Sequence, residues 1–140
     1  MDLIDTLNIA SQGLTAQRVR LQTISANMAN ARTTRTDEGG PYQRKVPVFL
    51  ANQVDPFGTE LEQALSGVDV TEIRSDEQVG QRLYQPEHPD ADADGYVEYP
   101  NVDILSEMVD MMSTTRSYEA NANVVDVTRE LSRRALEIGR

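Results

Sequence analysis

Apolar residues near the N-terminus recur at alternating intervals of four and three positions. The set consists of Leu3, Leu7, Ala10, Leu14, Leu21, Ile24 and Met28, with Gln17 as a polar interruption. Such spacing is typical of the narrow seam of a coiled coil rather than the wider stripe of a globular helix. No proline occurs before Pro41. The pattern predicts a helix over about residues 3–30, roughly 40 Å long at 1.5 Å per residue.

The C-terminal part of the chain repeats this pattern. The stripe consists of Ile104, Met108, Met111, Thr115, Tyr118, Ala122 and Val125, and Leu131 continues it after a shift of phase. Asp103 lies directly before the stripe, where an N-cap belongs, and Glu107 places a negative charge in the first turn. The pattern predicts a second helix over about residues 103–138.

Residues 36–100 contain short alternating stretches separated by proline, glycine and acidic residues. Residues 42–50 alternate as in a strand with one buried face, and Pro47 restricts this strand to a sheet edge. Further short strands are predicted at residues 68–73, 83–84 and 96–99. Residues 51–66 are predicted to form a loop or a short helix, and Gly39 and Gly40 are expected to end the first helical region.

These elements predict a mainly α chain, in which two long terminal helices pair as an antiparallel coiled coil beside a small β-containing acidic insert. The expected segments are an N-terminal coiled-coil helix (1–35), the insert (36–100) and a C-terminal coiled-coil helix (101–140), the two ends forming one helical domain. Only 39% of the residues are apolar and 5% are aromatic, which is low for a large self-contained core. Some apolar surface is therefore expected to be buried against other chains.

The formal net charge of −10 is concentrated in the middle of the chain, where residues 36–100 carry fourteen acidic and four basic side chains. Nucleic acids require a surface of lysine and arginine that releases their counterions, so the charge argues against them and against anionic membrane surfaces. The N-terminal segment lacks the basic start and apolar core of a cleavable signal peptide, and no apolar run has the length of a membrane span. We therefore expect no nucleic-acid partner and no membrane insertion.

The stretch PDADADGYVEYPN, residues 89–101, begins like a calcium loop, with aspartates at alternating positions followed by glycine. An EF-hand loop follows a helix and closes its ligand shell with a bidentate glutamate at position 12. Position 12 here is Asn101, and two prolines before the loop prevent a helix from leading into it. A solvated turn is favoured, and a soluble coiled-coil interaction protein with a calcium-binding acidic loop is the alternative function.

Enzymatic functions have little support in the sequence. The absence of cysteine excludes thiolate catalysis and Cys-based zinc sites, and the single histidine, His88, disfavours a Ser/His/Asp triad. The tripeptide His88-Pro89-Asp90 matches that of J-domain chaperone partners, but prolines and acidic residues flank it instead of helices. We expect no catalytic, cofactor-binding or metal-binding residues. A hydrolase that uses paired carboxylates is a third alternative.

Three stretches resemble the flagellar axial proteins, the family of rod, hook and filament subunits. SANMANARTTR, residues 25–35, is similar to the Asn-rich motif that ends the first helix in that family. RSYEANANVVDV, residues 116–127, is similar to the matching motif of the C-terminal helix. YQPEHPDADADGYVEYPNVDILSEMVDMM, residues 84–112, is similar to a block found in proximal rod subunits of the basal body.

The resemblance implies a structural subunit that is exported unfolded by the flagellar type III apparatus and assembles in the periplasm into the drive-shaft rod. The implied partners are other copies of the chain, other proximal rod proteins, the protein that joins the rod to the MS ring, and the export apparatus. The implied location is the rod of the basal body.

Isolated amphipathic helices gain most of their stability from packing, so the two helices are expected to pair and to leave apolar residues for neighbouring subunits. The candidate residues for pairing and assembly are Leu3, Leu7, Leu14, Leu21, Ile24, Asn27, Met28, Asn30, Ile104, Met108, Met111, Tyr118, Asn121, Asn123, Val125 and Leu131. The four asparagines lie among alanines. By analogy with the single asparagine that fixes coiled-coil register, we hypothesise that they set register between subunits; the alternative is that they are exposed or cap helix ends.

Overall fold

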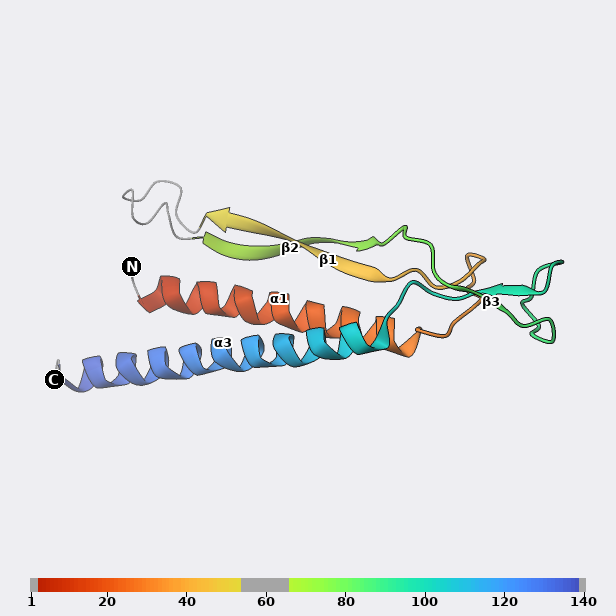
Figure 1. Ribbon diagram of the computed structural model, residues 1–140. Coiled ribbons are helices and arrows are strands. Elements are labelled where there is room, and N and C mark those ends of the chain that lie inside the picture. The colour runs from red at the N-terminus through yellow and green to blue at the C-terminus, as the bar shows by residue number, and fades with distance from the viewer. Residues whose placement is uncertain (1–2, 54–65, 139–140) are drawn as a thin grey trace.

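The computed structural model describes residues 3–53 and 66–138. Its elements are α1 (Leu3–Ala29), β1 (Lys45–Gln53), β2 (Ser66–Ser75), β3 (Arg82–Tyr84), β4 (Tyr96–Glu98) and α3 (Ile104–Ile138). Two long helices and two small antiparallel sheets agree with the predicted mainly α chain with a β-containing insert (Figure 1). Residues 51–53 and 66, predicted in a loop or short helix, belong instead to β1 and β2, and residues 54–65 of that prediction lie outside the described residues.

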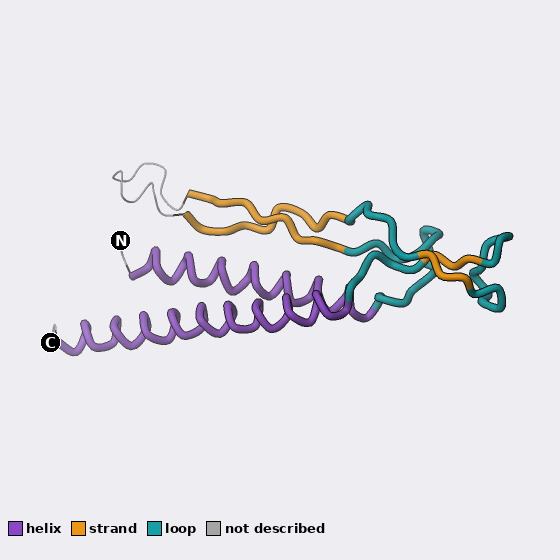
Figure 2. The backbone as a smooth tube through the Cα atoms, in the orientation of Figure 1, coloured by secondary structure: helices purple, strands orange, loops and turns teal. Residues whose placement is uncertain are grey.

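The helices α1 and α3 lie side by side and run in opposite directions (Figures 1 and 2). Arg20 of α1 lies 3.7 Å from Asp110 near the start of α3. Further along the pair, a Cβ atom added at Gly13 would lie 2.9 Å from the side-chain nitrogen of Asn121. Residue numbers fall along α1 as they rise along α3, which establishes the antiparallel arrangement.

Local hydrogen bonds define where α3 begins. The backbone N–H of Leu105 donates to Asp103 Oδ1 at 3.0 Å, and Ser106 Oγ donates to Asp103 Oδ2 at 2.8 Å. These bonds lower the pKa of Asp103, the Ser106 hydroxyl contributing most, because they stabilise the ionised carboxylate. The predicted N-cap at Asp103 is confirmed.

Side-chain hydrogen bonds close the end of α1, and a glycine turn lies further along the chain. Asn30 Nδ2 donates to the carbonyl of Ala26 at 2.9 Å, and Thr33 Oγ1 donates to Asn30 Oδ1 at 3.2 Å. Gly39 and Gly40 have φ angles of +88° and +75°, a region that favours glycine. The helix ends at Ala29, close to the predicted end near residue 30, whereas Gly39 and Gly40 form a later turn and do not end the helix as predicted.

The hairpin of β1 and β2 packs along α1, on the side away from α3 over most of the length of α1 (Figure 2). Pro47 lies opposite Ile73 in a two-stranded sheet, where both strands are edges, as the proline requires. Gly67 of β2 is buried against α1, and a Cβ atom there would overlap the side-chain oxygen of Gln12. Glycine at this position allows the hairpin to approach the helix closely.

A second hairpin, formed by β3 and β4, projects at the end of the molecule opposite the two chain termini (Figure 1). Tyr84 and Tyr96 are paired across it, with ring centroids 5.3 Å apart in an edge-to-face arrangement. Arg82 lies over the Tyr96 ring, 5.4 Å from its centroid. We call this hairpin the tip.

The interior of the subunit is thin and contains few large apolar side chains. The buried apolar residues among those described are Ala10, Ala16, Ile24, Ala31 and Val97, and the buried polar ones are Thr23, Asn27, Glu107, Thr114 and Thr128. Small and polar groups thus make up much of the contact between the layers. Neither α1 nor α3, over its described residues, has a stretch apolar enough to cross a membrane.

Candidate assembly surface and polar junction

A buried amide on α1 connects three elements. Asn27 is only 1% exposed. Its Nδ2 donates to the carbonyl of Lys45 at 2.9 Å and to Glu107 Oε2 at 3.3 Å. Its Oδ1 accepts from the backbone N–H of Lys45 at 2.8 Å and from the hydroxyl of Tyr42 at 3.0 Å. Asn27 therefore joins α1 to the start of β1 and to α3.

Glu107 is the charged centre of the same contact, and it is also 1% exposed. Its Oε1 accepts from Arg44 Nε at 2.6 Å, and the Arg44 guanidinium lies 4.0 Å from Asp110. A buried carboxylate needs such partners, because an unpaired buried charge is costly. We call Asn27, Tyr42, Arg44, Glu107 and Asp110 the polar junction.

Two further groups complete the surroundings of the junction. Burial, and secondly the negative charge of Glu107, raise the pKa of Tyr42, so the phenol stays protonated and donates to Asn27. Asn101 Oδ1 accepts from the backbone N–H of Arg44 at 2.9 Å, and its Nδ2 donates to the carbonyl of Asp76 at 3.4 Å. Asn101, which occupies position 12 of the calcium-like stretch, thus connects the segment before α3 to the β1–β2 hairpin.

The surface of α3 that contacts α1 is polar. Its residues recur every seven positions and are Glu107, Thr114, Asn121 and Thr128, which we call the polar stripe. The buried hydroxyls of Thr114 and Thr128 donate to carbonyls one turn earlier in α3, at 2.6 and 2.7 Å. Asn121 lies against Gly13, whose missing side chain leaves room for it. The centre of the helix contact is therefore made from small and hydrogen-bonding groups.

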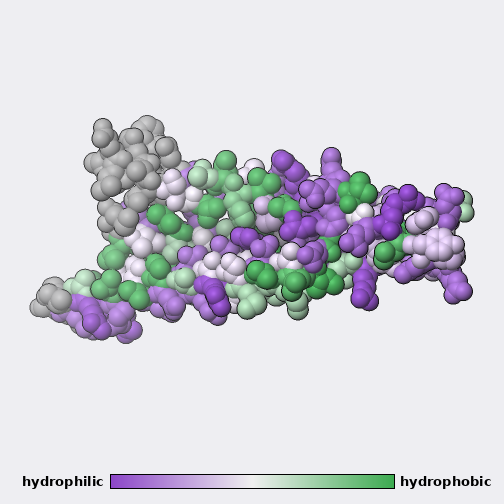
Figure 3. Space-filling model, in the orientation of Figure 1, coloured by the Kyte–Doolittle hydropathy of each residue, from purple (hydrophilic) through white to green (hydrophobic). Residues whose placement is uncertain are grey.

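Most apolar residues at the start of α3 are exposed, whereas Met111 is half-buried beside α1. Leu105, Val109 and Met112 are 71%, 60% and 60% exposed. Together with the exposed Ile104 and Met108, they form what we call the apolar face. In Figure 3, apolar side chains gather over the first turns of α3. A contiguous apolar patch on a single chain indicates a surface that another protein covers.

The candidate pairing residues fall into two groups in the structure. On α1, Ile24 and Asn27 are buried, Leu3 is exposed, and the half-buried ones are Leu7, Leu14, Leu21 and Met28. On α3, Met111, Asn121 and Val125 are half-buried, and the exposed ones are Ile104, Met108, Tyr118, Asn123 and Leu131. The predicted stripe of α1 faces other elements, whereas that of α3 lies along the margin of the helix contact. The polar stripe occupies the centre.

The four candidate asparagines have different surroundings. The amide of Asn27 bonds to Lys45, Tyr42 and Glu107 and so joins α1 to other elements of the same subunit. Asn121 faces Gly13, Asn30 bonds to the last turn of α1, and Asn123 is exposed. Register between subunits stays a prediction.

Sequence reasoning missed the main residues of the polar junction. Glu107 was assigned only a helix-dipole role, and Tyr42 only a strand position, while Arg44 and Asp110 were not singled out. One signal was available: the polar stripe recurs every seven residues, the same period as the apolar pattern beside it.

The acidic stretch at residues 89–101 contains part of the loop of the tip (89–95), strand β4 (96–98) and the segment that leads to α3. Asp92 Oδ1 accepts from the backbone N–H groups of Asp94 and Tyr96 at 3.0 and 2.8 Å, and Oδ2 lies 2.5 Å from an Arg82 nitrogen. These bonds lower the pKa of Asp92, the Tyr96 N–H contributing most. Gly95 has a φ of +82°, as the turn requires. Within residues 3–53 and 66–138, no three acidic or histidine side chains are arranged to hold a metal ion.

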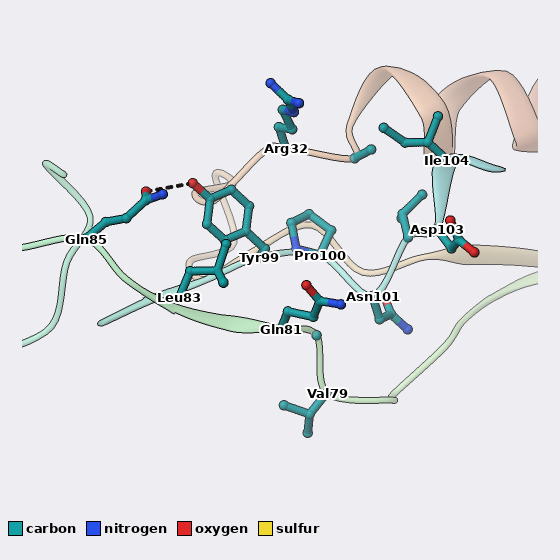
Figure 4. Close-up of a pocket in the computed structure, with 13 residues that line it drawn as sticks. Arg32, Val79, Gln81, Leu83, Gln85, Tyr99, Pro100, Asn101, Asp103 and Ile104 are labelled. Atoms are coloured by element: carbon teal, nitrogen blue, oxygen red, sulfur yellow. Dashed lines mark hydrogen bonds between the residues drawn. The ribbon is translucent and has the colours of Figure 1, made fainter. Parts of the chain in front are cut away.

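A groove of about 650 Å³ lies where the tip meets the helix pair (Figure 4). Tyr99 and Pro100 lie within it, and the Tyr99 hydroxyl donates to Gln85 Oε1 at 2.9 Å. Leu83 comes from β3, and Ile104 comes from the apolar face. The groove therefore continues the apolar face toward the tip, and its apolar and amide walls suit contact with a protein.

Comparison with known proteins places both ends of the chain in one class. Residues 7–35 match the model of a family described as "Flagella basal body rod protein". Residues 93–138 match that of "Flagellar basal body rod FlgEFG protein C-terminal". The two matches cover most of α1 and the whole of α3, the helix that carries the polar stripe and the apolar face. The class is that of flagellar basal-body rod proteins, as the sequence motifs predicted.

Full-length relatives identify the family within this class. The chain is 42% identical to flagellar basal-body rod protein FlgC of Borreliella burgdorferi, over 99% of this chain and 98% of that protein. It is 42% identical to FlgC of Bacillus subtilis over the full length of both, and 38% identical to FlgC of Salmonella typhimurium over 99% of both. The chain belongs to the FlgC family of flagellar basal-body rod proteins.

Proposed function

We propose that the chain is a structural subunit of the flagellar basal-body rod, and that neighbouring subunits cover the apolar face of α3. The observation that carries this proposal is the orientation of α3, which turns a polar stripe toward its own α1 and apolar side chains toward solvent. Burial of one exposed leucine, valine or methionine contributes about 1.5–3 kcal/mol. Association between subunits would therefore bury apolar side chains that folding of the single chain leaves exposed, and would gain the corresponding free energy.

Contacts of this kind suit a rod. A surface on one subunit that meets a different surface on the next does not close on itself, and its repetition gives a helical assembly. The partners we propose are other copies of the chain, other proximal rod proteins, and the protein that joins the rod to the MS ring. The subunit reaches the periplasm through the flagellar type III export apparatus.

The two helices act as one helical domain made of residues 1–35 and 101–140, with residues 36–100 as an insert. The sequence pattern predicts that these two helices pair as an antiparallel coiled coil, and neighbouring helices would pack on the exposed margin of α3. We expect no enzymatic activity, because the buried carboxylate, Glu107, is engaged by Arg44 and Asn27 in a structural contact.

The experiment is complementation of a strain that lacks the gene. The double variant Val109→Glu/Met112→Glu places two charges on the apolar face and should abolish swimming, with no rod beyond the inner-membrane ring in electron micrographs of basal bodies. The control is Thr71→Glu, which adds a charge at an exposed site on β2, away from α3. Normal rods in the double variant, or a complete flagellum in the deletion strain, would disprove the proposal.

A further inference from the structure

The helix α3 is packed in an unusual orientation for an amphipathic helix. Such a helix normally turns its apolar side toward its partner. In this subunit Glu107, Thr114 and Thr128 are buried, while Leu105 and Met112 are mainly exposed. Some feature of the subunit must therefore stabilise this orientation against the one that hydrophobic burial alone would favour.

The competing orientation is close to the observed one. Successive residues of an α-helix are separated by about 100° around its axis. A rotation of α3 by one residue, about 100°, would bring Met108, Thr115 and Ala122 to the places of Glu107, Thr114 and Asn121. Those three belong to the stripe that the sequence pattern predicts as the pairing seam. The rotated helix would thus place Met108 and Ala122, with Thr115 between them, against the half-buried leucines of α1.

The polar junction opposes this rotation. Glu107 accepts from Arg44 at 2.6 Å and from Asn27 at 3.3 Å. Both partners are held in place by other bonds, because the backbone N–H of Arg44 donates to Asn101 and the amide of Asn27 bonds to Lys45 of β1. Rotation would carry Glu107 away from both, and would leave Asn27 without one of its acceptors. A polar side chain in a helix contact is known to select one register among several, because the other registers leave it unpaired.

We propose that Glu107 determines which face of α3 packs against α1. Its bonds to Arg44 and Asn27 hold the polar stripe against α1, so the apolar face stays exposed for contact with neighbouring rod subunits. This inference rests on the proposed function for its biological meaning. The orientation of α3 in the isolated subunit can be measured independently of any rod.

The test uses disulfide crosslinking of the purified full-length subunit. The chain has no cysteine, so a disulfide can form only between the two cysteines that are introduced. A Cβ atom at Gly13 would lie 3.3 Å from Cγ of Asn121, so the pair Gly13→Cys/Asn121→Cys reports the observed orientation. The pair Gly13→Cys/Ala122→Cys reports the rotated one. Both are oxidised with copper-phenanthroline, and the crosslinked fraction is measured on non-reducing gels.

With Glu107 present, the pair at positions 13 and 121 should crosslink more efficiently. The substitution Glu107→Leu should reverse the order of the two pairs, since it removes the junction and adds an apolar residue. The matched control is Glu130→Leu, which removes a glutamate from the same helix. Glu130 forms an exposed ion pair, in which its Oε1 lies 2.9 Å from Arg134 Nε. This control should leave the order unchanged.

Two results would overturn the proposal. One is a folded Glu107→Leu subunit in which positions 13 and 121 still crosslink more efficiently. The other is loss of helical circular dichroism in Glu107→Leu, because the proposal requires that a second packing be available. In the complementation strain, Glu107→Leu should also abolish swimming. Reversed crosslinking with normal swimming would keep the orientation role of Glu107 and contradict the proposed role of the apolar face.

Discussion

Replacement of Asn27 by alanine should destabilise the isolated subunit far more than its small change in volume suggests. Asn27 is 1% exposed and makes four hydrogen bonds, two to the backbone of Lys45, one to Tyr42 and one to Glu107. The alanine variant removes all four and leaves the Lys45 backbone groups without their side-chain partner.

The size of the stability loss in Asn27→Ala depends on which hydrogen-bond partners the groups around Asn27 still have. A buried group left without its hydrogen bond costs about 1–3 kcal/mol. Lys45 is exposed as a residue, so water replaces part of what its backbone loses, and Glu107 keeps its bond to Arg44. We therefore expect a loss of about 2–3 kcal/mol in the free energy of unfolding. For a chain of this size, that corresponds to a decrease of roughly 6–12 °C in Tm.

The assay is thermal and urea unfolding of the purified subunit, followed by circular dichroism. The matched control is Asn123→Ala, which removes the same side chain from an exposed position on α3 and should change the stability by less than about 0.5 kcal/mol. If Asn27→Ala and Asn123→Ala unfold at the same urea concentration, the polar junction does not stabilise the subunit, and the reasoning above is wrong.

Two further variants test the connections around the junction. The pKa of Asp103 is lowered in the folded chain, so the stability that its charge contributes is complete above the ordinary aspartate range and is lost as the pH falls through the lowered value. Asp103→Ala should therefore reduce Tm at neutral pH and differ less from the unmodified chain in strong acid, with Asp103→Asn intermediate; a Tm difference that stays constant down to strongly acidic pH would contradict this. At Gly80, a Cβ atom would overlap the carbonyl oxygen of Tyr99, so Gly80→Ala should detach the tip from the helix pair. Hydrogen exchange should show faster exchange of the Tyr99 amide, which donates to the carbonyl of Gln81 at 2.9 Å. The control Thr71→Ala, at an exposed site on β2, should leave that amide protected; equal protection in both variants would count against the contact.

Local features of the fold could be predicted because short-range physical chemistry decides them. The N-cap at Asp103 needs only an acidic side chain within reach of the next N–H groups, and the edge position of Pro47 follows from its missing N–H. The turn at residues 89–101 could likewise be distinguished from an EF-hand, because a neutral Asn101 cannot supply two carboxylate oxygens. Such features depend on residues near one another in the chain.

The orientation of α3 could not be predicted in the same way. The apolar spacing indicated a seam through Met108 and Tyr118, and in an isolated pair of helices that seam is the reasonable choice. The orientation of α3 depends instead on Arg44. This residue lies 63 residues before Glu107 in the chain, directly before the β1–β2 hairpin, and is brought to Glu107 by the fold. The seven-residue recurrence of the polar stripe within α3 does not by itself show that this stripe, rather than the apolar one, faces α1.

The sequence by itself therefore determined the lengths and types of the main elements, the acidic character of the insert, and the motifs that place the chain among the flagellar rod proteins. Only the tertiary structure decided which side of α3 faces α1. The physical reason is the energetic difference between the two faces: a buried Glu107 requires charged and amide partners that only the folded chain brings together, and once they hold it, the apolar residues beside it remain exposed for contact with the next subunit.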